Sequence, residues 1–212
     1  MTWTRAFGRG CGVLLDAIVR WLALAHINPN VLTFLGLVVN SIAAVLFGSA
    51  NAENQARMFR YAGFVIIGSG FFDLVDGRVA RATNRVTRFG GFFDSVIDRY
   101  SDASQFLGLL VFYARYDRFF YVVLTAFVMI SSIMVSYTRA RAESLIGSCK
   151  VGFMERPERL VLVIIGALFN RMAPVLWVIA VLSTITVIHR IRYTWTRTQG
   201  IDAHAASAGQ AG

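Results

Sequence analysis

The chain of 212 residues contains few of the residues on which disulfide-rich and zinc-binding domains depend. It has three prolines, three histidines and two cysteines, and a single lysine among its 21 basic residues. The cysteines, Cys11 and Cys149, form no disulfide framework and have no metal-ligand spacing. The three histidines likewise have no partner at such a spacing. The sequence therefore offers no basis for a disulfide framework or for a metal site built on histidine and cysteine.

The charge is one-sided, with a formal net charge of +9 and an isoelectric point of about 10.4. A basic balance of this size commonly indicates a nucleic-acid partner. The single lysine, the lack of a basic tail and the lack of a basic face interleaved with aromatic residues argue against one here. We therefore expect no nucleic-acid binding and attribute the charge to membrane topology and to anionic lipid.

The hydropathy of the chain indicates a membrane protein. Apolar residues make up 56% of the sequence, and the mean hydropathy is +0.58. This composition predicts an all-α integral membrane protein rather than a soluble one. Six transmembrane helices are expected, at residues 31–50, 57–82, 88–113, 119–137, 158–170 and 173–190. The fourth helix is expected to continue beyond its span through Arg141.

Two terminal segments differ from the spans in pattern. Residues 13–26 carry apolar side chains at helical spacing, which predicts an amphipathic helix that lies in the membrane interface or packs on the bundle. Residues 198–212 are small, polar and rich in glycine and alanine, so we expect a disordered tail. We therefore predict a single membrane domain at residues 1–197, with no internal repeat.

The distribution of arginines predicts the orientation in the membrane. The joins between the first and second, third and fourth, and fifth and sixth spans hold Arg57, Arg60, Arg115, Arg118 and Arg171. The other sixteen of the 21 basic residues lie on the opposite side, with both termini. Because short cytoplasmic segments carry the excess of arginine and lysine, that side is expected to be cytoplasmic. We predict a multi-pass protein of the cell (inner) membrane with both termini inside.

Four carboxylates interrupt the apolar sequence where a lipid-embedded chain should carry none. Asp73, Asp76, Asp94 and Asp98 fall within 26 residues, and each pair recurs along one face of a helix. A charged residue at membrane depth costs roughly 2.5–3.5 kcal/mol, so four acids require a compensating partner. Hard divalent cations bind carboxylate oxygens and leave coordination positions for phosphate groups. The spacing therefore predicts a site for Mg²⁺ or Mn²⁺ near the cytoplasmic face.

Small residues and an arginine share the helix faces of these acids. Gly77, Ala80 and Gly90 lack side-chain bulk, so a ligand can approach the backbone closely. Arg81 supplies a planar guanidinium suited to phosphate. An intramembrane ion-pair cluster of the acids with nearby arginines is the alternative, but it explains neither the small residues nor the regular spacing. Those arginines are Arg78, Arg81 and Arg99.

The motif resembles the signature of a known enzyme family. The pattern D-x-x-D-G-x-x-A-R-x8-G-x-x-x-D-x-x-x-D is matched without a departure, and it is similar to that of the CDP-alcohol phosphatidyltransferases. The resemblance implies integral membrane enzymes with six transmembrane helices that usually form homodimers. It also implies that an alcohol displaces CMP from a CDP-lipid with the help of a divalent metal.

The resemblance assigns roles to individual residues. The metal ligands are expected to be Asp73, Asp76, Asp94 and Asp98, with Asp98 also acting as the general base. Residues expected to contact the CDP-lipid are Asn28, Pro29, Asn30, Val31, Gly77, Arg81, Thr87 and Gly90. Asn28 departs from the threonine that the family commonly has at this position. Asp102 continues the face of Asp94 and Asp98 but lies outside the signature, so we interpret it as structural.

A second group of charged residues points to the acceptor. The segments 137–143 and 155–159 resemble those of bacterial phosphatidylinositol-phosphate synthases, which join CDP-diacylglycerol to myo-inositol 3-phosphate. This resemblance implies an acceptor-phosphate pocket formed by Arg139, Arg159 and Arg190. Arg139 replaces a family lysine, which leaves glycerol 3-phosphate open as the acceptor. Local pairing of each arginine with a glutamate is the simpler alternative.

Two interpretations from other functional classes also stay open. Acids that face one another inside a helical bundle could conduct divalent cations, as in a channel or transporter. That interpretation predicts acids along the whole membrane path, whereas these acids stop near one face. A purely structural membrane subunit is the other possibility.

Overall fold

The computed structural model of the protein describes residues 28–82 and 86–209, and every regular element in them is a helix. The helices are α2 (Pro29–Ser49), α3 (Gln55–Ala82), α4 (Arg88–Arg115), α5 (Phe119–Ile146), α6 (Arg156–Leu168) and α7 (Met172–Gly209). The all-α class predicted from the sequence is confirmed, and each helix overlaps one of the six predicted segments. The amphipathic helix predicted at residues 13–26 lies outside the described residues.

Four of these helices are long and apolar enough to cross a membrane. They are α2, α3, α5 and α7. The first half of α4 carries two acids of the motif, and α6 has only 13 residues. A bilayer core about 30 Å thick requires roughly 20 helical residues, so α6 is too short to cross alone. In the described residues, length and composition therefore support four spans, where the sequence predicted six.

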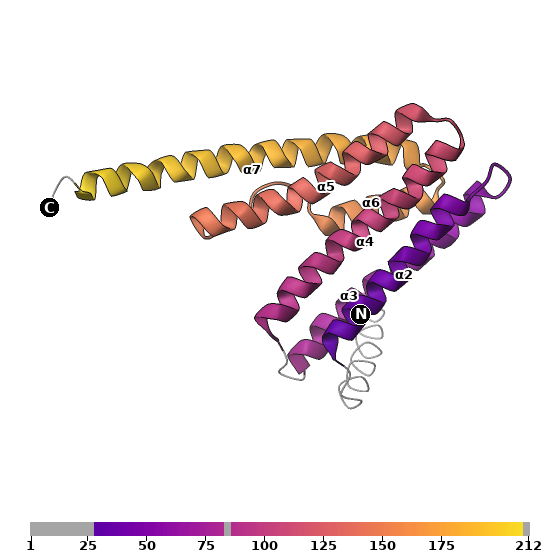
Figure 1. Cartoon of the computed structure of the whole chain (residues 1–212), viewed down its shortest axis with the longest axis horizontal. Coiled ribbons are helices and arrows are strands. Elements are labelled where there is room, and N and C mark those ends of the chain that lie inside the picture. The colour runs from indigo at the N-terminus through magenta and orange to yellow at the C-terminus, as the bar shows by residue number, and fades with distance from the viewer. Residues whose placement is uncertain (1–27, 83–85, 210–212) are drawn as a thin grey trace, which may run out of the picture.

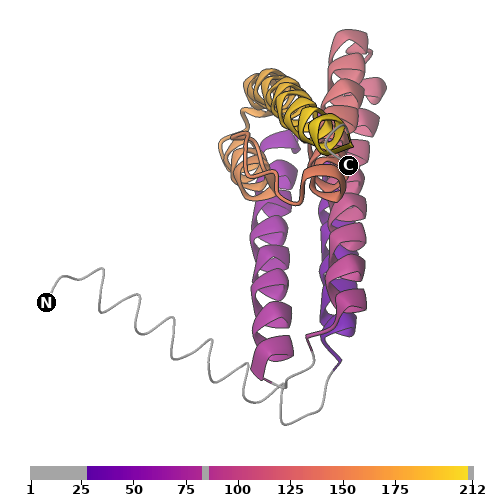
Figure 2. The same ribbon diagram turned by 90° about the vertical axis from the view of Figure 1, so that its left-hand side faces the viewer.

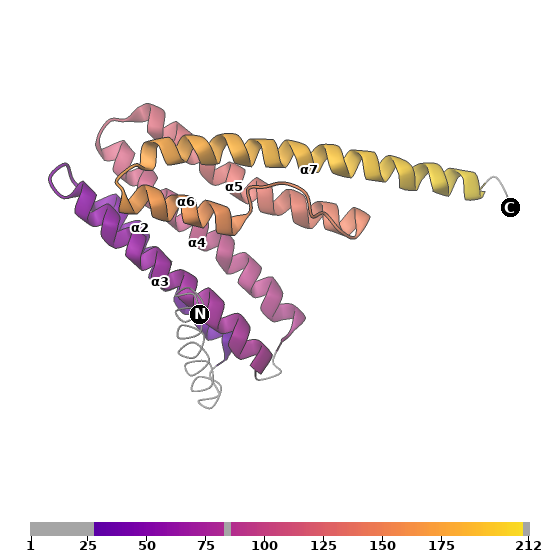
Figure 3. The ribbon, with the colours of Figure 1, turned by 180° about the vertical axis from the view of Figure 1, so that it is seen from behind.

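The six helices pack in a closed ring. Helix α2 packs against α3 and α4, α4 against α5, α5 against α7, α7 against α6, and α6 against α3. Figure 1 shows α2, α3 and α4 running together and α7 lying across their direction. Figure 2, turned by 90°, shows α3 and α4 as two neighbouring columns, and Figure 3 shows α6 beside α3. This ring brings the motif helices α3 and α4 close to the charged start of α6.

Local sequence accounts for where the helices begin. At the start of α2 the Asn28 side chain accepts a hydrogen bond from the Asn30 backbone N–H at 3.0 Å, and Pro29 occupies the first turn. At the start of α4 the Thr87 hydroxyl accepts one from the Gly90 backbone N–H at 2.9 Å. These caps fix the two helix starts that border the motif.

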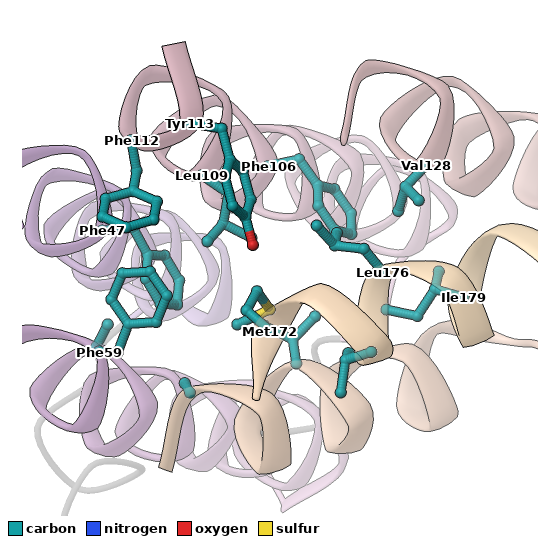
Figure 4. Packing of buried hydrophobic residues seen from close by; sticks show 14 of the residues in the cluster. Phe47, Phe59, Phe106, Leu109, Phe112, Tyr113, Val128, Met172, Leu176 and Ile179 are labelled. Carbon is teal, nitrogen blue, oxygen red and sulfur yellow. The ribbon is translucent and has the colours of Figure 1, made fainter. Parts of the chain in front are cut away.

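An aromatic cluster fills the end of the ring that lies away from the motif (Figure 4). The ring of Phe59 lies edge-on to Phe47 at 5.0 Å and to Phe112 at 4.9 Å between centroids. Such edge-to-face pairs add about 0.5–1.5 kcal/mol beyond the area that they bury. Where α2 crosses α4, a Cβ on Gly108 would collide with the Ala44 backbone, so only glycine permits this close approach.

Three buried polar side chains connect α2, α3 and α4 between the aromatic cluster and the motif. The Asn40 amide donates to the Ser69 hydroxyl at 2.6 Å and accepts from the Gln105 amide at 2.7 Å. The Ser69 hydroxyl donates to the Gly36 carbonyl at 3.1 Å. Hydrogen bonds of this kind replace the hydrophobic drive that is missing between helices in lipid. One turn beyond Ser69 on α3 is Asp73, so this network also sets the position of the acid motif.

The C-terminal helix is longer than the sequence predicted. Helix α7 continues to Gly209, so the disordered tail expected at residues 198–212 is helical as far as residue 209. Alanines at positions 203, 205, 206 and 208 explain the difference, because alanine has the highest helix propensity. An established helix also extends at low cost, since nucleation has already taken place.

Candidate active site

A cavity of about 280 Å³ lies between the start of α2, the end of α3 and the start of α4. It is lined by Pro29, Asn30, Thr33, Gly77, Ala80, Arg81, Val86, Thr87, Gly90, Gly91 and Asp94. Six of the eight residues predicted to contact a CDP-lipid are therefore brought together, although they come from three helices. Asn28 and Val31 do not line it, because Asn28 caps α2 and the Val31 side chain is half exposed.

Two glycines keep this cavity open. A Cβ on Gly90 would lie 3.0 Å from the Thr87 hydroxyl and 3.5 Å from the Asn30 side-chain oxygen. A Cβ on Gly77 would lie 3.6 Å from the Arg81 guanidinium. Thr33, Val86 and Gly91 also line the cavity but were not predicted from the sequence. Helical spacing could have identified Thr33, because it follows Pro29 by one turn and donates to its carbonyl at 3.2 Å.

Two of the motif acids converge on one cationic group. Nη1 of Arg156 lies 2.8 Å from Oδ2 of Asp73 and 2.9 Å from Oδ1 of Asp98. One acid of α3 and one of α4 thus face a common point, and the Arg156 guanidinium lies at that point. Asp94 lines the neighbouring cavity. Asp76 lies on α3, and its side chain is outside the part of the structure described.

The donor set suits a divalent cation, but the four predicted ligands are not all seen together. Among the described side chains, which exclude that of Asp76, no three histidine, cysteine or acidic residues are close enough to bind one metal ion. Asp73 and Asp98 already share a positive partner, and they offer only oxygen donors. Such donors fit Mg²⁺ and Mn²⁺. The metal site of Asp73, Asp76, Asp94 and Asp98 therefore stays a prediction.

Asp102 joins this acid pair to a second arginine. Its Oδ2 lies 2.6 Å from Nη2 of Arg159, and its Oδ1 lies 3.6 Å from Nε of Arg156, a distance too long for a hydrogen bond. Arg159 is only 3% exposed, and its Nε and Nη1 have no hydrogen-bond partner among the described residues. A buried guanidinium with unsatisfied N–H groups is unfavourable unless a ligand completes it.

The other two predicted acceptor arginines meet at Glu155. Its Oε1 accepts from Nη1 of Arg139 at 2.8 Å and from Nη2 of Arg190 at 3.1 Å. Arg139 also pairs with Glu143 at 3.0 Å, and the nearly fully buried Arg190 donates to the Val151 carbonyl at 2.8 Å. Because Glu155 immediately precedes α6 and Arg159 lies one turn into it, all three arginines gather around the start of α6. The pairing with glutamate that the sequence left as an alternative is present for Arg139 and Arg190.

Arg156 is the central residue of the site that the sequence analysis left without a role. Burial by itself would lower the pKa of Arg156, but the carboxylates of Asp102, Asp98 and Asp73 outweigh it and raise that pKa. The guanidinium therefore carries a full positive charge amid three acids. The only signal in the sequence was its position in the 155–159 segment, three residues before Arg159.

Comparison with known proteins identifies the family of this chain. Residues 26–189, most of the chain, match the family model of the CDP-alcohol phosphatidyltransferases. The chain belongs to this family. It is accordingly an enzyme, a transferase of phospholipid synthesis, and the channel and structural-subunit interpretations are set aside.

Individual relatives are similar over nearly their whole length. An archaetidylinositol phosphate synthase of Pyrococcus horikoshii is 39% identical over 179 residues, covering 84% of this chain and 88% of the relative. The phosphatidylinositol phosphate synthase of Mycobacterium tuberculosis is 36% identical over 200 residues, covering 89% and 88%.

Two crystal structures of the Mycobacterium tuberculosis enzyme share the fold. The one with CDP-DAG bound has a TM-score of 0.77 at 32% identity and covers 86% of this chain and 94% of that one. The one in complex with manganese and citrate has a TM-score of 0.76 at 33% identity and covers 86% and 89%.

Proposed function

We propose that this protein transfers the phosphatidyl group of CDP-diacylglycerol to a hydroxyl of myo-inositol 3-phosphate, releasing CMP. The observation that carries this proposal is the environment of Arg159. In the described part of the chain its buried guanidinium has two N–H-bearing nitrogens without hydrogen-bond partners, and it is joined through Asp102 to the acid pair. A phosphorylated acceptor would satisfy these groups, because guanidinium binds phosphate through parallel hydrogen bonds. The names of the relatives above agree in one respect, since each makes an inositol phosphate lipid.

The cavity between α2, α3 and α4 is the proposed site for the CDP part of the donor. Gly77 and Gly90 let the nucleotide approach the helix backbones, and Arg81 binds its phosphates. Thr87, Asn30 and the backbone around Pro29 complete the nucleotide contacts, and Asn28 and Val31 shape that turn from outside the cavity. Support comes from the solved relative that holds CDP-DAG.

Asp73, Asp76, Asp94 and Asp98 are proposed to hold one or two divalent cations, Mg²⁺ or Mn²⁺, beside this cavity. When bound, such a cation supplies positive charge that stabilises the phosphoryl oxygens and the departing CMP. The convergence of Asp73 and Asp98 on one cationic point supports the assignment, as does the manganese in a solved relative.

The remaining chemistry is a direct displacement at phosphorus. The acceptor hydroxyl oxygen bonds to the phosphorus that carries the diacylglycerol, and the bond from that phosphorus to the CMP oxygen breaks. Asp98 takes the hydroxyl proton as general base, and CMP leaves with the electron pair. Arg139, Arg159 and Arg190 hold the acceptor phosphate and so orient its hydroxyl toward the cavity.

The proposed location is the cell membrane, with six spans and with both termini and the active site on the cytoplasmic side. Residues 1–197 are proposed to form one membrane domain, and two copies of the chain are proposed to form a homodimer. The three short joins gather at one end of the bundle, where the Gln55 side chain donates to the Asn170 side chain at 2.9 Å. Five arginines belong to the segments around that end, and in the sequence the other basic residues fall in the segments on the opposite side of the predicted spans. The charged parts of α4 and α6 face protein rather than lipid, which membrane placement requires.

Glycerol 3-phosphate is the second candidate acceptor, because Arg139 replaces a family lysine. The test is CMP release by purified protein from CDP-diacylglycerol with Mg²⁺ or Mn²⁺, with inositol phosphate, with glycerol phosphate, or with neither. Release that depends on inositol phosphate supports the proposal, and release that depends only on glycerol phosphate replaces the acceptor. No release with either contradicts the proposed reaction.

A further inference from the structure

One cation in this structure has more acidic partners than any other described. Arg156 lies at the start of α6, and its Nη1 contacts Asp73 on α3 and Asp98 on α4 at hydrogen-bond distance. Its Nε faces Asp102 at 3.6 Å. The side chain is 23% exposed, and Asp98 and Asp102 are less exposed still, so water screens these charges weakly.

The contacts of Arg156 coincide with those proposed for the divalent cation. Oδ2 of Asp73 and Oδ1 of Asp98 are the atoms that Nη1 holds. A carboxylate oxygen turned toward a guanidinium nitrogen cannot at the same time coordinate a metal ion along that direction. Two like charges at one point would also repel strongly in a weakly screened site. Binding of a cation by these acids and binding of Arg156 by the same oxygens are therefore competing events.

A third acid, Asp102, lies close enough to pair with Arg156 after its release from Asp73 and Asp98. Oδ1 of Asp102 lies 3.6 Å from Nε of Arg156, whereas the contacts with Asp73 and Asp98 are made by Nη1, and Oδ2 of Asp102 holds Nη2 of Arg159 at 2.6 Å. Nε of Arg156, like Nε and Nη1 of Arg159, is buried without a hydrogen-bond partner among the described residues. A guanidinium released from Asp73 and Asp98 can remain paired with Asp102. It would then lie beside Arg159, where two guanidinium groups present donors to one anion.

We propose that Arg156 couples the cation site to the acceptor site. A divalent cation displaces Arg156 from Asp73 and Asp98, and the displaced guanidinium joins Arg159 in binding the phosphate of the acceptor. This inference rests on the proposed function and adds to it an exchangeable internal cation. It assigns Arg156 two opposite effects, because the side chain opposes cation binding and favours anion binding.

The experiment compares Arg156→Gln with the unchanged full-length protein. Mn²⁺ affinity is measured from the electron paramagnetic resonance signal of free Mn²⁺, and affinity for myo-inositol 3-phosphate is measured by calorimetry at saturating Mn²⁺. Arg156→Gln should bind Mn²⁺ about tenfold more tightly, because the competitor is gone. It should bind the inositol phosphate about tenfold more weakly, because one guanidinium is lost. Arg141→Gln is the matched control, since this exposed arginine on α5 carries the same charge and its side chain makes a hydrogen bond only to Ser144 among the described residues.

The outcomes separate the two proposals. Equal or weaker Mn²⁺ binding by Arg156→Gln overturns the role of Arg156, and so do shifts of the same size in Arg141→Gln. If Arg156→Gln does not fold, Arg156→Lys serves instead. Lysine keeps the charge but not the planar fork of arginine, so the affinity for the inositol phosphate should fall while the Mn²⁺ affinity changes less. Unchanged affinity for the inositol phosphate in Arg156→Lys overturns the coupling. Failure of the unchanged protein to bind Mn²⁺ would instead overturn the proposed cation site itself.

Discussion

Arg159 and Asp102 form the shortest described ion pair between different helices, with 2.6 Å between Nη2 and Oδ2. The two residues are 57 positions apart, on α6 and α4, and both are largely buried. This pair connects the acids of the motif to the arginines around the start of α6, and it makes Asp102 part of the site rather than a neighbour of it.

The first prediction concerns the stability of this pair. Asp102→Ala leaves the buried Arg159 without its counter-ion, and removal of one partner of a buried pair costs about 3–5 kcal/mol. We expect a clearly lower thermal unfolding temperature in detergent or nanodiscs. Glu53→Gln, which removes an exposed acid near the α2–α3 join, should change it little. Equal effects of the two substitutions would mean that the Asp102 contact contributes nothing specific.

The second prediction tests the general base. Asp98→Asn removes the group proposed to accept the hydroxyl proton while keeping the size of the side chain. CMP release should fall by more than about 100-fold, and binding of CDP-diacylglycerol should be largely retained. Asp117→Asn, a change at an exposed acid in the α4–α5 join, is the matched control. Loss of CDP-diacylglycerol binding together with substantial residual turnover would refute this role for Asp98.

The third prediction concerns the acceptor pocket. Arg159→Gln removes the buried charge that the acceptor phosphate is proposed to satisfy. The KM for inositol phosphate should rise by about tenfold or more, because a charge-assisted hydrogen bond contributes roughly 1.5–3 kcal/mol. The KM for CDP-diacylglycerol should stay nearly constant. Arg171→Gln, at the opposite end of the bundle, is the control, and both variants are compared by steady-state kinetics. A rise of both KM values together in Arg159→Gln would contradict the prediction.

The fourth prediction addresses the shape of the nucleotide cavity. In Gly90→Ala the new Cβ would lie 3.0 Å from the Thr87 hydroxyl, closer than most real contacts, and would narrow the cavity beside Asn30. We expect a higher KM for CDP-diacylglycerol with little change for the acceptor. Gly68→Ala on α3 is the control, because its Cβ meets nothing within 4 Å. Direct binding measurements should show a lower affinity for CDP in Gly90→Ala than in Gly68→Ala. Unchanged CDP affinity in Gly90→Ala would count against this site.

The fifth prediction concerns the buried polar network. Asn40→Ala removes the partner of both Ser69 and Gln105, which are themselves almost fully buried. The cost in unfolding free energy should be about 1–2 kcal/mol, near the upper end for hydrogen bonds between membrane helices. Ser41→Ala removes only a hydrogen bond within α2 and should cost less. Mn²⁺ affinity should also fall in Asn40→Ala, because the network positions α3 one turn from Asp73.

Local sequence identified part of the cavity between α2, α3 and α4. Helical spacing singled out Gly77 and Gly90, the family resemblance singled out Pro29, and all three line this cavity. For the two glycines this was possible because helical spacing determines which side chains share a face, whatever the helix packs against. The starts of α2 and α4 are also set locally, since Asn28 and Thr87 accept hydrogen bonds from backbone N–H groups two and three residues away.

Other features did not follow from local pattern. Residues 198–209 are helical because α7 continues through them. The composition of the segment alone does not reveal that continuation. The arginine that meets Asp73 was also not among Arg78, Arg81 and Arg99, the nearby arginines that the sequence offered as the alternative to metal. The observed partner of Asp73 is Arg156, 83 residues away.

By itself, the sequence determined that this protein is helical, which residues lie on common helix faces, and that two of those faces carry acids and small residues. It could do so because backbone periodicity and capping are local properties. Which charge each acid meets depends on helix packing, since the ring of helices brings the start of α6 against α3 and α4. Electrostatic pairing depends on distance in space, and in this protein packing sets that distance.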